Sequence, residues 1–109
     1  MILVWVPDTG YVRGTKETLA SLGVPLRPAP GRNRTVEPCR AVVLSEASKI
    51  GAKEVEAVSA GPQRRRPGGQ FAARVHMRVT YPSFGAFEVR DSKLTCIVDK
   101  NGKIVDAFN

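Results

Sequence analysis

The stretch FAARVHMRVTY, residues 71–81, decides the fold, because apolar residues occupy every second position along it. A period of two is typical of a β-strand that buries one of its faces. The apolar set would point toward a core and consists of Phe71, Ala73, Val75, Met77, Val79 and Tyr81. The intervening set includes Arg74, His76, Arg78 and Thr80, so the sequence predicts a strand with one covered and one polar face.

An amphipathic helix is expected to cover the apolar face of this strand. Apolar residues recur at spacings of four, four and three between positions 38 and 50, and Gly51 would end the helix. They are Cys39, Val43, Ala47 and Ile50. Because helix and strand each need an apolar partner, we expect this stripe to pack on Val75, Met77, Val98 and Val105.

Local patterns predict the remaining elements. Residues 1–6, 53–60 and 86–90 are expected to be strands, and Thr15 is expected to cap a short helix of about two turns. Residues 93–108 predict a hairpin whose type I′ turn, Asn101–Gly102, pairs Val98 with Val105 and Cys96 with Ala107. The basic segments 25–36 and 61–70 are rich in proline and glycine and are expected to be loops.

Together these patterns predict a single α+β domain spanning residues 1–109. An N-terminal strand and two helices would be followed by a mostly antiparallel sheet of four to five strands that ends in a C-terminal β-hairpin. A chain of 109 residues leaves no room for a second independent core.

The composition narrows the function classes. Lysine and arginine outnumber aspartate and glutamate by 17 to 10, giving a net charge of +7, which favours an anionic partner. One histidine and two distant cysteines do not supply a usual zinc site, and neither a phosphate-binding loop nor a dinucleotide-binding motif is present. We therefore expect no metal and no cofactor.

The apolar N-terminus MILVWV is too short to cross a bilayer and lacks the basic flank of a secretion signal. No membrane partner and a cytoplasmic location are therefore expected. In a reducing compartment Cys39 and Cys96 would be free buried thiols, although a disulfide between them would close a long loop.

The arginines gather in two regions poor in acidic residues. A run at positions 64–66 leads through a proline-glycine turn into the polar side of the central strand, and further arginines lie in segment 25–36. Arginine binds phosphate oxygens in bidentate geometry. The leading hypothesis is a non-catalytic protein that binds nucleic-acid backbone, DNA or RNA, through an arginine-rich loop and sheet face. The expected contact residues are Arg64, Arg65, Arg66, Arg74, Arg78, Arg32 and Arg34.

Two alternatives remain open. The basic surface could dock on an acidic or nucleic-acid-mimicking protein, as in a small regulator or inhibitor of the kind that phages and plasmids carry. The third function is a metal-independent ribonuclease in which His76, flanked by two arginines, transfers protons. The sequence places no second histidine or clear carboxylate beside it, so non-catalytic binding leads. Trp5 is expected in the core, and an exposed Trp5 would instead indicate an interface.

Overall fold

The computed structural model describes residues 1–7, 9–20, 22, 24–83 and 85–109, and this part of the chain forms an α+β fold. It contains one mixed sheet of seven strands and two α-helices. The elements are β1 (Ile2–Val6), β2 (Gly10–Gly14), α1 (Lys16–Ala20), α2 (Val36–Ser48), β3 (Glu54–Ser59), β4 (Arg64–Arg66), the 3₁₀ helix η1 (Pro67–Gly69), β5 (Gln70–Ser83), β6 (Ala86–Val98) and β7 (Ile104–Phe108).

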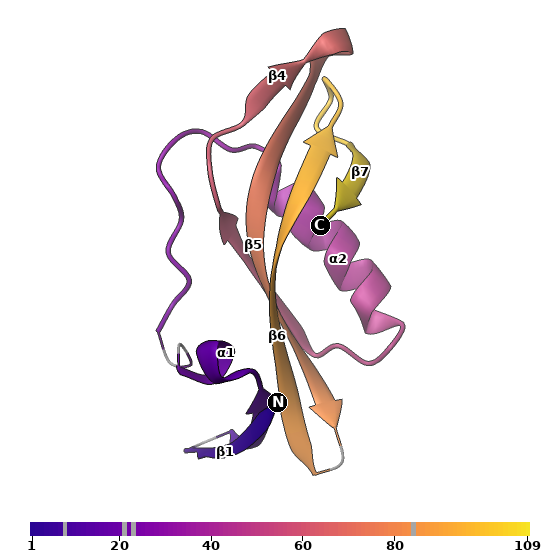
Figure 1. Ribbon diagram of the computed structural model, residues 1–109. Helices are drawn as coiled ribbons and strands as arrows, with labels where there is room; N and C mark the ends of the chain where they lie inside the picture. The colour runs from indigo at the N-terminus through magenta and orange to yellow at the C-terminus, as the bar shows by residue number, and fades with distance from the viewer. Residues whose placement is uncertain (8, 21, 23, 84) are drawn as a thin grey trace.

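A long antiparallel hairpin of β5 and β6 runs the length of the molecule (Figure 1). The strand order is β1-β2-β6-β5-β3, with β4 paired to β5 and β7 paired to β6. Among the described strands, only β2 and β6 pair in parallel. One end of the molecule holds β1, β2 and α1, and the other holds β4 and the β6–β7 turn, along a longest dimension of 47 Å.

The expected packing of α2 on the sheet is confirmed for most of its stripe. Cys39 and Ala47 share a buried cluster with Val75 and Met77, and Val43 packs against it. The prediction is wrong for the last stripe residue, because Ile50 is 72 % exposed. The helix ends at Ser48, and the N–H of Ile50 donates to Ala47 O, a tighter turn that moves the side chain off the stripe.

The expected break between residues 90 and 93 does not occur, because β6 is continuous. Its polar residues find partners on β5: Asp91 lies opposite Arg78 and Lys93 lies opposite His76. Cross-strand pairs of this kind stabilise a sheet. The strand therefore continues through a segment that looks too polar when taken alone.

The C-terminal hairpin forms with a different turn from the expected one. Cys96 pairs with Ala107 as predicted, but a bulge after Ile97 pairs Val98 with Ile104, leaving Val105 54 % exposed. Asp99 explains the longer turn, since its Oδ1 accepts hydrogen bonds from the N–H groups of Asn101 and Lys103. The bond from Lys103, with the weaker effect of that from Asn101, lowers the pKa of Asp99.

Segment 61–70 is a second hairpin, not the loop expected from its composition. Arg64–Arg66 forms β4, which pairs with β5 from Ala72 to Gln70. The turn between them uses Gly68 and Gly69, whose φ angles of 81° and 77° suit glycine. The arginine run is therefore held in an extended conformation with a defined register.

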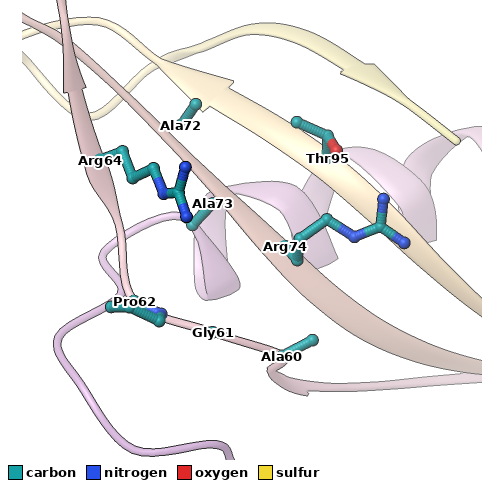
Figure 2. A pocket seen from close by; sticks show the side chains of 8 residues that line it. All are labelled: Ala60, Gly61, Pro62, Arg64, Ala72, Ala73, Arg74 and Thr95. Atoms are coloured by element: carbon teal, nitrogen blue, oxygen red, sulfur yellow. The ribbon is translucent and has the colours of Figure 1, made fainter.

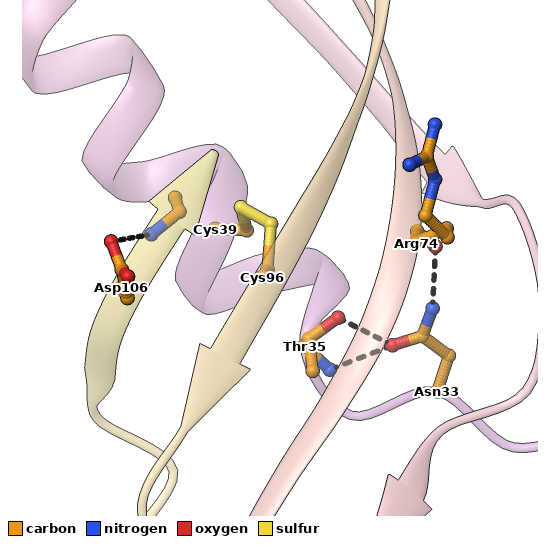
Figure 3. Close-up of a disulfide and its surroundings, with 7 residues drawn as sticks. Asn33, Thr35, Cys39, Arg74, Cys96 and Asp106 are labelled. Atoms are coloured by element: carbon orange, nitrogen blue, oxygen red, sulfur yellow. Dashed lines mark hydrogen bonds between the residues drawn. A yellow bond between two sulfur atoms is a disulfide. The ribbon is translucent and has the colours of Figure 1, made fainter. Parts of the chain in front are cut away.

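The expected loop 25–36 has no helix or strand up to residue 35, but α2 begins at Val36, and Asn33 connects the loop to the sheet. The Asn33 Nδ2 group lies within hydrogen-bonding distance of Ser59 Oγ, Gly61 O and Arg74 O, at 3.0, 3.1 and 3.0 Å. Its Oδ1 accepts from the N–H and hydroxyl of the buried Thr35, just before α2 (Figure 3). Asn33 thus links the loop, α2 and the central strand.

The N-terminal segment differs most from expectation. Thr15 caps α1 as predicted, with Oγ1 accepting from the Thr18 N–H, but β2 was not predicted. Trp5 is 64 % exposed, so its expected place in the core is wrong. β1 pairs only with β2 among the described strands, and the face of β1 that carries Trp5 points away from the buried Val12.

Cys39 and Cys96 form a disulfide, which corrects the expectation of free thiols (Figure 3). Cys39 lies on the buried stripe of α2 and Cys96 on the face of β6 that α2 covers, with 6.2 Å between their Cα atoms. The pairing follows from the packing of two apolar stripes against each other, a tertiary contact that an argument from redox compartment alone does not include.

We expect the disulfide to be a main source of stability. For cysteines separated by 57 positions, the chain-entropy relation gives about 4 kcal/mol. Urea unfolding of the oxidised protein, compared with the Cys39→Ser, Cys96→Ser double variant, measures this difference. Equal unfolding midpoints and slopes for the two proteins would contradict it.

Candidate anion-binding face

The open face is the side of the sheet opposite α2, and it carries the polar residues of β5. Side chains of directly paired residues share a face. In the half near β4, this places Arg64 beside Ala72, Arg66 beside Gln70, and Arg74 beside Thr95. Arg64, Arg66 and Arg74 therefore lie on one face, and all three are exposed.

Strand geometry divides the arginine run between the two faces of the sheet. Arg65 is opposite Phe71, which belongs to the face that α2 covers. The Arg34 guanidinium also lies on that side, 5.7 Å from the centre of the Phe71 ring, a distance at which a cation–π interaction is favourable. Arg34 and Arg65 are thus separated from the arginines of the open face.

A hollow of about 400 Å³ lies between Arg64 and Arg74. In Figure 2 the Arg64 side chain extends from β4 over this space, whereas the Arg74 side chain extends from β5 away from Arg64, toward β6. No acidic residue is among the described residues that line it, and small side chains form its floor. The lining consists of Ala60, Gly61, Pro62, Arg64, Ala72, Ala73, Arg74 and Thr95.

Arg74 also borders a second, shallower hollow that continues the basic surface. Its other lining residues include His76, Asp91 and Lys93. An Arg74 guanidinium nitrogen lies 3.4 Å from the backbone oxygen of Lys93, which directs the Arg74 side chain toward the adjacent strand β6. Arg66, Arg64, Arg74 and Lys93 therefore follow one another in this order across the open face, and we call these four residues the basic row.

Phe108 on β7 borders the basic row. It pairs with Thr95, which pairs with Arg74, so the three side chains share the open face. Phe108 is 46 % exposed. An aromatic ring beside a row of cations is an arrangement on which a nucleic-acid base can stack.

Arg78 lies on the same face but is only 5 % exposed. Its Nε donates to Asp91 Oδ1 at 3.0 Å, and Glu56 is opposite it on β3. The N-terminal segment covers this half of the open face, enclosing a hollow of about 380 Å³ lined by residues of that segment and by Arg78. Arg78 therefore has a structural role in an ion pair and does not belong to the exposed basic row.

His76 stands at the border between the covered and exposed halves of the open face. Its Nε2 lies 3.9 Å from Asp91 Oδ1, and 27 % of its side chain is exposed. Local sequence patterns do not reveal this carboxylate, because Asp91 comes close to His76 only through the pairing of β5 with β6.

The remaining arginines of the 27–40 region contribute less to this surface. Arg40 Nε donates to Val55 O, and its guanidinium pairs with Glu37 at 3.5 Å. The backbone oxygen of Arg32 accepts from the Gln63 N–H, which brings the exposed Arg32 close to the start of β4. Arg27 is exposed in the loop before α2.

Sequence reasoning missed Lys93, Asp91 and Phe108 as members of this region. The register of the β5–β6 hairpin would have found the first two, since a turn closing between Ser83 and Ala86 pairs Arg78 with Asp91 and His76 with Lys93. Phe108 depends in addition on the bulge that shifts β7.

Comparison with known proteins finds no matching family model, no similar curated protein and no similar solved structure. Within the described ranges, no helix is long and apolar enough to cross a membrane. The described residues also contain no group of three or more histidine, cysteine or acidic side chains that could hold a metal ion. The site must therefore be interpreted from its own chemistry.

We expect Arg78→Leu to destabilise the protein, because it leaves Asp91 without its main partner in a mostly covered site. Breaking such a pair costs about 2–4 kcal/mol once the partial exposure of Asp91 is considered. The control is Lys49→Leu, since Lys49 and Glu46 form an ion pair in which both side chains are 67 % exposed, worth under about 1 kcal/mol. Equal urea unfolding midpoints for the two variants would contradict a structural role of Arg78.

Proposed function

We propose that the chain is a non-catalytic protein that binds a phosphate-bearing polyanion, foremost nucleic-acid backbone, through the basic row on its open face. The observation that carries the proposal is the hollow between Arg64 and Arg74, which two arginines border without an acidic neighbour in its lining. Guanidinium groups match phosphate oxygens in bidentate geometry. Arg66 and Lys93 extend the row in both directions, as a polymer requires.

The arrangement favours backbone contacts over sequence reading. Base-edge recognition needs several donors and acceptors that converge on one base pair, whereas the basic row is spread along the sheet. Phe108 offers a platform for stacking a base, which is tolerant of sequence. We therefore propose single-stranded nucleic acid as the preferred form.

We also propose that the protein works in an oxidising compartment instead of the cytoplasm. The support is the buried Cys39–Cys96 disulfide, because disulfides persist mainly in oxidising environments. Polyanions other than nucleic acid also occur there, so the binding experiments include inorganic polyphosphate as a competitor of the same phosphate chemistry.

Binding to a fluorescent oligonucleotide should weaken with salt. If the four cations of the basic row each neutralise one phosphate, the log–log slope is about −3 for a single strand and slightly steeper for a duplex. Fluorescence anisotropy over a salt series measures the slope for single strand, duplex and polyphosphate competition. No binding by the unmodified chain at low salt would remove the polyanion proposal and favour an acidic protein partner.

The arginines of the run 64–66 point alternately to the two faces of the sheet, which allows a matched pair of double variants. The double variant Arg64→Ser, Arg74→Ser should reduce the steepness of the log–log salt slope by about 1.5 and weaken binding about tenfold or more. Arg34→Ser with Arg65→Ser removes the same charge from the opposite face and should change binding much less. Equal weakening by both double variants would show that net charge, not the open face, drives binding.

A ribonuclease is the second candidate, and the position of Asp91 favours it. His76, Asp91, Arg74 and Lys93 border one hollow, which brings a proton-transfer group, a carboxylate and two cations together. We expect binding without cleavage, because Asp91 is already engaged by Arg78 at 3.0 Å.

Incubation with RNA in the presence of a chelator separates the two functions. We expect no cleavage by the unmodified chain and unchanged RNA affinity in His76→Ala. Metal-independent cleavage that falls about 10²- to 10⁴-fold in His76→Ala, with affinity retained, would establish the ribonuclease instead.

A further inference from the structure

The β1–β2 hairpin concentrates apolar surface at the end of the molecule remote from the basic row (Figure 1). Half of the large hydrophobic residues exposed in the described chain lie in this short segment: Met1, Ile2, Leu3, Trp5 and Tyr11. Single exposed apolar residues are ordinary, but a contiguous group is typical of an interaction surface.

The hairpin presents a defined outer face. Leu3 pairs with Arg13 and Trp5 pairs with Tyr11, so these side chains share the face opposite that of the buried Val12. The Trp5 and Tyr11 rings meet edge to face with 5.1 Å between their centres. This mutual contact holds two aromatic side chains in place and leaves both largely exposed.

The outer edge of β1 is also open. β1 ends the strand order, and β2 is its only partner among the described strands. Natural proteins usually protect edge strands with charged residues or proline. The strand ILVWV has none, whereas arginines form β4, and Glu54 and Glu56 lie on the edge strand β3.

We propose that a second copy of this chain occupies the surface, with the β1 strands of the two copies pairing antiparallel across a twofold axis at Val4. This register places Leu3 of each copy beside Trp5 of the other and Ile2 beside Val6. The two sheets then continue into one another, and Leu3, Trp5 and Tyr11 of both copies form one apolar strip on the outer face, with Arg13 of each copy at its ends.

Self-complementarity singles out a second copy as the occupant. A twofold interface requires one patch to match itself. When the strand ILVWV pairs antiparallel with the same strand of a second copy, apolar residues face apolar residues and no like charges meet. The arginines of β4 lie at the opposite end of a molecule 47 Å long. That separation exceeds the Debye length of about 8 Å at physiological salt, so their repulsion is screened.

A short contact between two β1 strands suits a reversible dimer. Cross-strand pairing covers part of Leu3 and Trp5 of each copy, which are 49 % and 64 % exposed in the single chain, and such a contact is smaller than the roughly 800 Å² per partner of a standard interface. The resulting dimer would present a basic row at each end. The dimer does not depend on the polyanion proposal, because it uses a different surface, and it can be tested without nucleic acid.

Sedimentation over a wide concentration range tests the dimer. We expect the unmodified chain to reach twice its mass of 11.8 kDa, and Leu3→Lys with Trp5→Lys to remain monomeric, because lysines on both sides of the axis repel. Ile50→Lys is the matched control at another exposed apolar residue and should dimerise normally. Circular dichroism and thermal melting of each variant show that it is folded.

Trp5 is the only tryptophan of the chain, so its fluorescence reports on the patch without any substitution. We expect its emission to shift to shorter wavelength over the concentrations at which the mass rises. A chain that stays monomeric with constant emission overturns the proposal and leaves the surface to a different partner. A dimer with constant Trp5 emission, or one that survives the lysine variant, places the interface elsewhere and also overturns it.

Discussion

The register between β5 and β6 is the constraint on which the rest of the structure depends. It runs without a shift from Phe71 with Val98 to Ser83 with Ala86. A slip of one residue would turn Val75 and Met77 away from α2 and move Arg74 and His76 into the core. The same register places Cys96 under Cys39 and sets Asp91 beside Arg78. Core, disulfide and polar face therefore follow from one hairpin.

The open face has two halves with different physical roles. Near the N-terminal segment it is covered, and the charge of Arg78 is paired with that of Asp91, while Glu56 is the residue opposite Arg78 on β3. A buried charge without such partners would be costly, so this half is a structural site. Toward β4 the face is uncovered, and Arg64, Arg66 and Arg74 remain available to solvent. The difference comes from what packs over each half and not from the residue types.

Charge and apolar surface are separated along the molecule. The arginines of β4 lie at one end of the long hairpin, and Trp5 and Tyr11 lie at the other (Figure 1). Such separation lets one surface bind an anionic partner while the other makes apolar contacts, because neither process has to desolvate the other's side chains. The 47 Å length of the molecule is thus relevant to both proposals.

Elements whose periodicity involves only neighbouring residues could be predicted from the sequence. The alternation in β5, the stripe of Cys39, Val43 and Ala47, and the cap at Thr15 all depend on neighbouring residues and were predicted correctly. Tertiary structure alone decided the disulfide, the burial of Arg78, the exposure of Trp5 and the division of the arginine run between two faces. These features depend on which distant strand lies beside a residue and what covers it. Composition made the run look like a loop, whereas pairing with Gln70–Ala72 made it a strand.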